Sequence, residues 1–225
     1  MRLEGNTLLL VEDFFNDLLK EQELAIFEKN EQLANELWAR IQNYNIVKNY
    51  VKAYSNLKEQ KYFEAWRLLD RVDIDINIVS NNFNLSDLFM LTFLKEIVPK
   101  YMKLFPYKYF TSRESIVKSS ECSICHRKFR LRNRCEHTIG KIYMGKLCVR
   151  IITEMSFVGV SIVENPVDRY TVLLSKEINY NYSILDKLME MLSSPFQRFD
   201  IDEQMNGSDK HLNVTVGSIQ LFELE

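Results

Sequence analysis

Apolar side chains recur every three to four positions between Leu10 and Ile41, which is the spacing of an amphipathic helix. Glutamate and lysine fill much of the opposite face. Asn30 interrupts the pattern, so two helices with a break at this residue are expected. An amphipathic helix of this kind usually packs on its own core, and this favours intramolecular packing over dimerisation.

Residues 49–72 predict a helix–turn–helix, with the segment LKEQK as the turn. Small Ala53 and Ala65 would let two helices approach closely. The spacing resembles part of a tetratricopeptide repeat, but less than one full repeat is present, whereas such folds need about three. A plain helical hairpin is therefore favoured. The positions that carry the resemblance are Ala53, Leu57, Tyr62, Ala65, Leu68 and Leu69.

Apolar and polar residues alternate strictly from Val72 to Ile78, a period-two pattern that predicts a strand. Asp73 and Asp75 would share one face of it, and paired carboxylates can hold a catalytic cation. No third carboxylate or histidine joins them at a recognisable spacing, so a solvated strand face is favoured.

Two further helices are predicted before the cysteines begin. Ser86 is placed to cap a helix that runs to Val98, and Pro99 should kink or end it. Thr111 and Glu114 have the spacing of a capping box, which predicts a short helix leading to the cysteines.

The chain changes character after Lys141, where β-branched and aromatic residues with glycine or proline punctuation predict two to four strands. A helix near residues 184–192 and a closing strand pair, 199–201 with 212–224, complete the expected elements.

Size and composition are ordinary for a soluble protein: 225 residues, 46% hydrophobic and 27% charged. The N-terminal apolar stretch is short, is interrupted by Glu12 and Asp13, and is followed by no small-residue cleavage site. No run approaches the eighteen or more apolar residues of a membrane span. A cytoplasmic location is the expectation.

All the cysteines of the chain lie within a short segment that also contains a histidine, in the pattern C-x2-C-x9-C-x-H-x10-C. Such crowding indicates a metal site, because a C-x2-C turn brings two thiolates to one ion and a second ligand pair completes a tetrahedron. His126 is the weakest candidate ligand. The remaining five candidates compete for four places, with either Cys135 or His137 as the uncertain one: Cys122, Cys125, Cys135, His137 and Cys148.

The ligand types favour one structural zinc ion. An iron–sulfur cluster would use four thiolates, which the chain possesses, so iron remains the alternative. The C-x-H element and the strand-rich segment beside it suit zinc better. Thiolate-rich sites are closed, whereas a catalytic zinc keeps an open position for water.

The region around these residues is strongly basic. Thirteen lysines and arginines but only three acids, Glu114, Glu121 and Glu136, lie between Val98 and Arg150, in a chain whose formal net charge is −2. Aromatic residues are interleaved with the cations. Such a surface fits nucleic acid or another polyanion. The alternative is a basic face docked on the acidic helical domain of the same chain or on a partner. The candidate contact residues are Arg127, Lys128, Arg130, Arg132 and Arg134.

Familiar enzyme signatures are missing. The chain has no P-loop, no dinucleotide-binding glycine pattern, no H-E-x-x-H and no zinc-deaminase signature. This favours a binding protein over an enzyme, with a metal-dependent nuclease or hydrolase using Asp73 and Asp75 as the enzymatic alternative.

Residues 104–172 resemble a zinc-containing segment of uncharacterised bacterial and phage-borne proteins. The similarity lies in PYKYFTSRE, CSIC, CEHTIGKIYMGKLC and SIVENPVDRY. The run S-I-V-x-x-P is also similar to a strand and turn of phage head-maturation proteases, but the helical N-terminal half shows no protease core. The resemblance implies a zinc site and a prokaryotic or phage setting, and no particular reaction.

These patterns together predict an α+β protein with three parts. Residues 1–112 form a helical domain with the tetratricopeptide-like hairpin, 113–176 a zinc-stapled β-rich module, and 177–225 a small α/β extension. The expected function is that of a non-catalytic adaptor, whose basic module binds nucleic acid while the helices bind a protein partner. A structural subunit of a complex, with a purely structural zinc, is the alternative.

Overall fold

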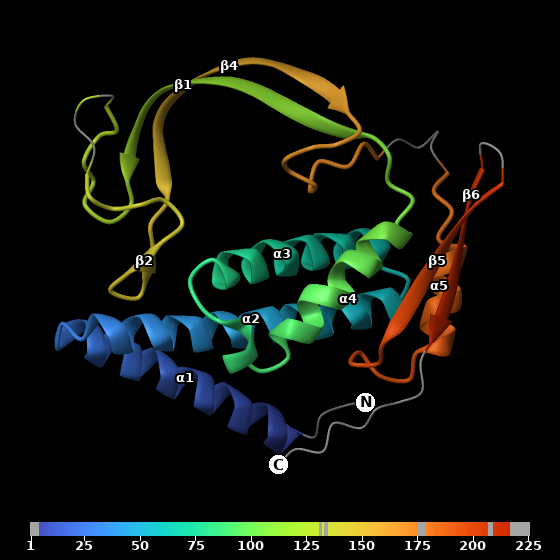
Figure 1. Cartoon of the computed structure of the whole chain (residues 1–225), viewed down its shortest axis with the longest axis horizontal. Helices are drawn as coiled ribbons and strands as arrows, with labels where there is room; N and C mark the ends of the chain where they lie inside the picture. The colour runs from blue at the N-terminus through green and yellow to red at the C-terminus, as the bar shows by residue number, and fades with distance from the viewer. Residues whose placement is uncertain (1–4, 131, 133–134, 175–178, 207–208, 217–225) are drawn as a thin grey trace. The chain divides into compact units, whose positions relative to one another are not determined.

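The computed structural model describes residues 5–130, 132, 135–174, 179–206 and 209–216, and it confirms the predicted α+β class. Within these residues the helices are α1 (Gly5–Phe27), α2 (Glu31–Lys58), α3 (Tyr62–Ser80), a short 3-10 helix (Leu85–Asp87), α4 (Leu91–Leu104) and α5 (Ser183–Met191) (Figure 1). The strands are β1 (Phe110–Cys122), β2 (Ile142–Tyr143), β3 (Lys146–Leu147), β4 (Arg150–Val163), β5 (Phe199–Asn206) and β6 (Asp209–Val216).

The chain forms two compact units that interleave along the sequence. Unit 1 comprises the described residues within Met1–Ile46, Asn77–Phe89 and Arg113–Val160. Unit 2 comprises those within Val47–Ile76, Met90–Ser112 and Ser161–Glu225. The boundaries between the units fall inside α2, α3, β1 and β4, so each of these elements belongs partly to both units.

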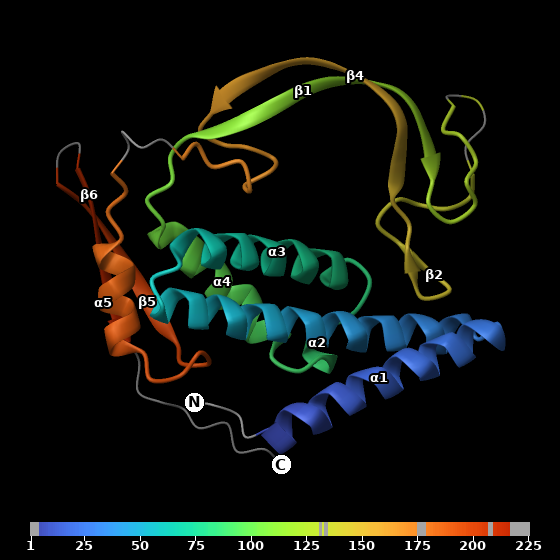
Figure 2. The same ribbon diagram turned by 180° about the vertical axis from the view of Figure 1, so that it is seen from behind.

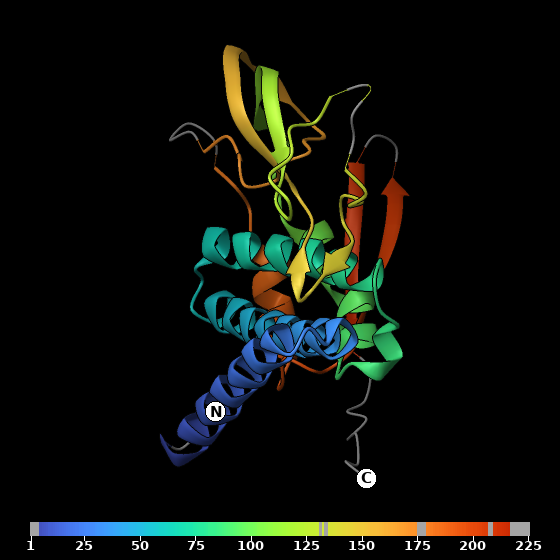
Figure 3. The ribbon, with the colours of Figure 1, turned by 90° about the vertical axis from the view of Figure 1, so that its left-hand side faces the viewer.

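In unit 1, α1 and the first part of α2 run antiparallel from a turn at the predicted break (Figures 1 and 3). Lys29 takes a left-handed φ of 58°, and the Asn30 side chain accepts from the Leu33 N–H at 3.2 Å, capping α2. The two helices share an apolar cluster, which fixes their contact: Leu18, Ala25, Ala34, Leu37 and Ile41.

In unit 2, the end of α2 and the start of α3 form the predicted helical hairpin. Its turn falls at residues 59–61, where Gln60 has a left-handed φ of 58°, and the small residues Ala53 and Ala65 are fully buried as close helix packing requires. Helices α4 and α5 add to this core, whose largest fully buried side chains include Tyr50, Leu57, Leu69, Leu94, Ile97, Tyr101 and Leu185.

The strand predicted from Val72 to Ile78 is wrong, because these residues continue α3. The residues that α3 buries here, Val72, Ile76 and Val79, are spaced by four and three positions, whereas Ile74 is 39% exposed. The apolar residues of this short stretch therefore lie on different faces of the helix, and their alternation with polar residues is a coincidence. No glycine or proline stops the helix before Ser80.

The predicted start of the next helix is also wrong, and of the two outcomes predicted at Pro99 the structure excludes an end. The side chain of Asn84, not Ser86, caps the short 3-10 helix, and α4 begins only at Leu91 after Met90 adopts a left-handed φ of 62°. Helix α4 does not end at Pro99 but continues to Leu104. Buried side chains beyond the proline, Tyr101 and Leu104, hold the last turn against unit 2 despite the missing hydrogen bond.

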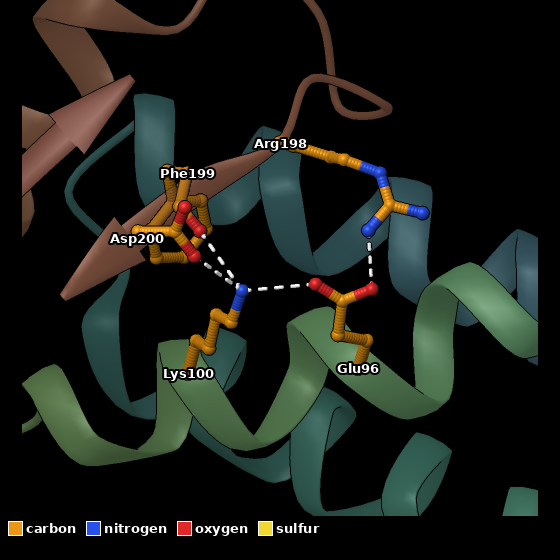
Figure 4. A network of polar contacts seen from close by, with 5 residues as sticks. All are labelled: Glu96, Lys100, Arg198, Phe199 and Asp200. Carbon is orange, nitrogen blue, oxygen red and sulfur yellow. Dashed lines mark hydrogen bonds and ion pairs between the residues drawn. The ribbon is translucent and has the colours of Figure 1, made fainter. Parts of the chain in front are cut away.

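An ion-pair network joins α4 to β5 in unit 2 (Figure 4). Lys100 Nζ lies 3.0 Å from Glu96 Oε1 and 2.7 Å from Asp200 Oδ1, and Arg198 donates to the second oxygen of Glu96. The hydrogen bonds from Arg198 and Lys100 lower the pKa of the Glu96 carboxyl. Because these groups are partly exposed, the network orients the strand more than it stabilises the fold.

Strands are present in both regions where they were predicted, after Lys141 and at the end of the described chain, and the described strands form three two-stranded sheets: β1 with β4, β2 with β3, and β5 with β6. The long β1–β4 ribbon is visible from both sides in Figures 1 and 2. It overturns the short helix predicted at Thr111 and Glu114, which lie in β1. The chain is extended there because Phe110 bridges Val172 and the Thr111 N–H donates to the Thr171 carbonyl at 2.8 Å. Helix α5 and the β5–β6 hairpin, which pairs Phe199 with Val216, confirm the predicted ending as far as residue 216.

Candidate metal centre

The first two candidate ligands lie at the end of β1, where the chain turns back on itself. The His126 N–H donates to the Cys122 carbonyl at 2.9 Å, and His126 takes a left-handed φ of 55°. The Ile124 N–H points at the Cys122 sulfur, 3.4 Å away. This turn places Cys125 beside Cys122, which is the purpose of a C-x2-C spacing.

The second pair, Cys135 and His137, lies on an irregular segment that returns to the same place. The His137 ring packs edge-on against Tyr143, with 4.7 Å between ring centroids. The Thr138 N–H donates to the Tyr143 hydroxyl at 2.8 Å. Tyr143 on β2 therefore sets the position of the histidine beside the cysteines.

The last cysteine follows β3. Cys148 is anchored by two backbone hydrogen bonds across the hairpin, from its own N–H to the Lys141 carbonyl and from the Gly140 N–H to its carbonyl, each 2.8 Å. Gly140 has a φ of 85°, which a residue with a side chain adopts with strain. Cys148 is fully buried, and its sulfur lies 3.7 Å from that of Cys122.

The ligand atoms of Cys122, Cys125, Cys135 and His137 all lie within 4.8 Å of one another, so this Cys/His cluster could hold a metal ion. His137 Nδ1 is 3.8 Å from the Cys122 sulfur. Both residues that the sequence left as alternatives are thus present in one group, and Cys148 adjoins it through Cys122. All five candidates come together. His126 lies outside the group, exposed and paired with Glu121 at 3.1 Å.

The thiols of the cluster differ in acidity. Burial acts to raise the pKa of Cys122, but the backbone N–H groups of Cys125 and Ile124 outweigh it and lower that pKa to about 6. Burial, with the hydrogen bond and negative charge of Cys122, raises the pKa of Cys148 to about 11. Burial also raises the pKa of Cys135. Among these three thiols, Cys122 therefore has the lowest pKa.

The hairpin between the ligands is fastened to the helices of unit 1. Asn35 on α2 accepts from the Gly145 N–H at 2.7 Å, and the Gln22 amide donates to the Gly145 carbonyl at 3.4 Å. Asn82 donates to the Gly140 carbonyl at 2.9 Å, and Lys141 Nζ donates to the Asn81 carbonyl at 2.7 Å. These amide side chains, Gln22 and Asn35 on helices and Asn82 in the turn after α3, were missed by sequence reasoning, because lone Asn and Gln residues carry no spacing signal.

The predicted nucleic-acid contacts lie on the loop between the two ligand pairs. Arg127, Lys128, Arg130 and Arg132 are exposed, and none forms an ion pair with another described residue. Arg134 lies outside the described residues. The loop starts by pairing with the end of β1, through the Phe129 N–H and the Ser120 carbonyl at 2.9 Å.

A groove of about 620 Å³ lies beside the cluster. Its walls include the cations Lys118, Arg130 and Arg150 and the ring of Phe129, with Cys135 and His137 also in its lining. Arg150 lies over the Phe129 ring, 5.1 Å from the centroid. One acid, Glu136, also faces the groove. The groove therefore has a positive lining next to the candidate metal site.

The enzymatic alternative loses its geometric basis, because Asp73 and Asp75 lie on helix α3 rather than on one face of a strand. Each is engaged by an arginine: Asp75 by Arg71 at 2.8 Å and Asp73 by Arg169 at 3.2 Å. Carboxylates neutralised in this way form ion pairs and do not present a cation site.

No family model, curated protein or solved structure matches this chain, so no relative supports a name or an activity. In the part of the chain that the structure describes, no helix combines the length and the apolar character needed to cross a membrane.

Proposed function

We propose that the Cys/His cluster, with Cys148 beside it, binds one zinc ion. The observation that carries the proposal is its compactness, with four ligand atoms within 4.8 Å of one another. Two thiolates at about 2.3 Å from a tetrahedral zinc are about 3.8 Å apart. The 3.7 Å between the sulfurs of Cys122 and Cys148 fits this edge. A four-iron cluster would hold its thiolates on separate iron atoms, and the presence of His137 also favours zinc.

The zinc serves structure rather than catalysis. The candidates supply more ligands than a tetrahedral ion can take, so no position is left for a reactive water. Thiolates also dominate the set and reduce the Lewis acidity of the ion. The metal joins the end of β1, the basic loop and the β2–β3 hairpin, three segments that have little apolar core of their own.

Elemental analysis of variants purified under reducing conditions tests this proposal. We expect one zinc per chain in the wild type. We expect loss of zinc in Cys122→Ser, because the Cys122 sulfur lies 3.8 Å from His137 Nδ1 and 3.7 Å from the Cys148 sulfur. His126→Ala is the matched control: it removes a neighbouring histidine outside the cluster and keeps the zinc. Parallel substitutions of Cys135, His137 and Cys148 identify the ligand set. Iron, or no metal in the wild type, contradicts the proposal.

We further propose that the zinc module binds nucleic acid through the basic loop and the groove beside it. Four exposed cations of the loop have no carboxylate partner among the described residues. Arg130 and Arg150 line the groove, where they can neutralise phosphates, beside Lys118, which is paired with Glu154 at 3.8 Å. Phe129 offers an aromatic surface close to a base.

Fluorescence anisotropy with a short single-stranded oligonucleotide measures this binding. We expect an affinity that falls steeply with salt, because each neutralised phosphate releases a counterion. Arg130→Glu with Arg132→Glu should weaken binding at least about tenfold at low salt. Arg40→Glu, an equally exposed charge reversal on α2 of the same unit, should have little effect. Salt-independent binding, or an equal loss in all variants, would contradict the proposal.

A further inference from the structure

The helical hairpin of unit 2 carries a groove of about 620 Å³, a volume within the range of small-ligand sites. Residues three and four positions apart share one side of a helix, so the groove is lined by one stripe on each helix of the hairpin. Lys52 and Asn56 are on the stripe of α2, and Arg67 and Arg71 are on that of α3. Tyr170, from the segment after β4, adds to the lining.

Three polar side chains of this groove lack a partner in the described part of the chain. Lys52, Asn56 and Arg67 form no hydrogen bond or ion pair there through their side chains, although Asn56 is half-buried. An ammonium, a carboxamide and a guanidinium group are rich in hydrogen-bond donors, and only the carboxamide also accepts. Donors gathered in one groove without acceptors point to a ligand that supplies negatively charged oxygen atoms.

Aromatic rings hold the guanidinium group of Arg67 in place. Its central carbon lies over the Phe63 ring, 6.0 Å from the centroid, and over the Tyr170 ring, 5.8 Å from the centroid. Such contacts use the flat faces of the guanidinium and leave its N–H edge free. That edge can donate two parallel hydrogen bonds to an anion with paired oxygen atoms. Arg67 is therefore arranged for an anion before the anion binds.

The other two cations of the groove are already neutralised. Lys61 lies 2.7 Å from Glu59, and Arg71 lies 2.8 Å from Asp75. The hydrogen bond and charge of Glu59 raise the pKa of Lys61, and the charge of Glu64, the acid in the lining, adds to this effect. An anion that enters the groove therefore meets two cations that have no counter-charge of their own.

We propose that this groove binds the phosphate group of a small phosphorylated molecule, held by Lys52, Asn56 and Arg67. A phosphomonoester carries nearly two negative charges and three acceptor oxygens, which matches two unpaired cations and one amide. A carboxylate or a phosphodiester carries only one charge. The site goes beyond the proposed function, because its residues lie in unit 2, whereas the candidate metal ligands and the basic loop lie in unit 1.

A heteronuclear NMR titration of the full chain with methyl phosphate tests the proposal. We expect saturable shifts of the backbone amide signals in residues 52–71 and at Tyr170. Dimethyl phosphate, with one charge, and acetate, a carboxylate, should bind at least about tenfold more weakly, because each leaves one of the two cations without a counter-charge. The absence of saturable shifts in these residues, or equal affinity for acetate, overturns the proposal.

Two substitutions test the assigned contacts. Lys52→Ala and Arg67→Ala remove exposed side chains from helices and should each raise the dissociation constant of methyl phosphate at least about tenfold. Lys95→Ala is the matched control, since Lys95 is an exposed lysine on α4 of the same unit and does not line the groove; it should bind as the wild type does. An equal loss in all three variants would overturn the assignment. Zinc content should be unchanged in each, so this site and the metal centre fail independently.

Discussion

Asp70 on α3 is a carboxyl group held in an unfavourable place within unit 2. It is 2% exposed, its Oδ1 lies 3.5 Å from Arg169, and its buried Oδ2 has no hydrogen-bond partner among the described residues. Burial raises the pKa of this carboxyl to about 6, and the attraction of Arg169 only partly opposes it. The same arginine also binds Asp73, so its charge is shared.

A raised pKa means that the folded protein keeps the Asp70 proton to a higher pH than the unfolded chain does. Stability should therefore fall as pH rises from about 4 to about 6, by up to about 3 kcal/mol, with the full penalty present above that window. Asp70→Asn cannot ionise, so its stability relative to the wild type should improve over this window. Urea unfolding at several pH values, followed by tryptophan fluorescence, measures the difference.

Asp73→Asn provides the control for this effect. It removes the other carboxylate that contacts Arg169 but leaves the buried Asp70 in place. The pH-dependent loss of stability should persist in it but become smaller, because the charge of Asp73 contributes to the raised pKa of Asp70. Parallel stability curves for the wild type and Asp70→Asn from pH 4 to pH 7 would show that Asp70 ionises in the folded state without cost.

At the scale of elements, the sequence correctly predicted those helices and turns whose conformation depends on neighbouring residues. The break at Asn30, the turn at residues 59–61 and the helix α5 follow from caps, left-handed turn residues and apolar spacing, all of which are written in a few neighbouring residues. Crowding of cysteine and histidine likewise predicted which residues gather, because metal ligands must lie close together whatever the surrounding fold.

Elements whose conformation depends on distant partners were predicted wrongly. Val72–Ile78 alternates like a strand, yet it continues a helix whose buried face is completed by residues far away in the sequence. Thr111 and Glu114 resemble a helix cap but belong to β1, where residues 171–172 supply the pairing. Periodicity over seven residues or fewer does not separate these outcomes, so tertiary contacts decide.

In the β2–β3 hairpin, one glycine determines how closely the turn can approach the helices. Gly145 has a φ of 69°, and a Cβ built there would approach the Ala34 carbonyl oxygen to 3.1 Å and the Gln22 amide to 2.7 Å. The hairpin tip therefore lies directly against α1 and α2 only because residue 145 has no side chain. The helices against which Gly145 packs could not be deduced from the spacing of residues in the sequence.

At the scale of the whole molecule, the two units draw on different sources of stability. Unit 2 has a core of buried aromatic and aliphatic side chains, including Tyr50, Leu94 and Tyr101. In unit 1 the helices share a small apolar cluster. The described residues between Cys122 and Cys148 contain the candidate metal ligands and are held by hydrogen bonds to those helices. All candidate ligands lie in unit 1.

Metal removal should therefore unfold one part of the protein and leave the other folded. A zinc chelator is expected to increase amide hydrogen exchange in residues 122–148 and at the adjoining ends of β1 and β4, because binding of the ion and folding of the site are coupled. Exchange in α4 and α5 of unit 2 should stay unchanged. Hydrogen-exchange mass spectrometry resolves these segments, and readdition of zinc should restore protection. Equal loss of protection in both units would mean that the metal site and the core of unit 2 fold as one cooperative structure.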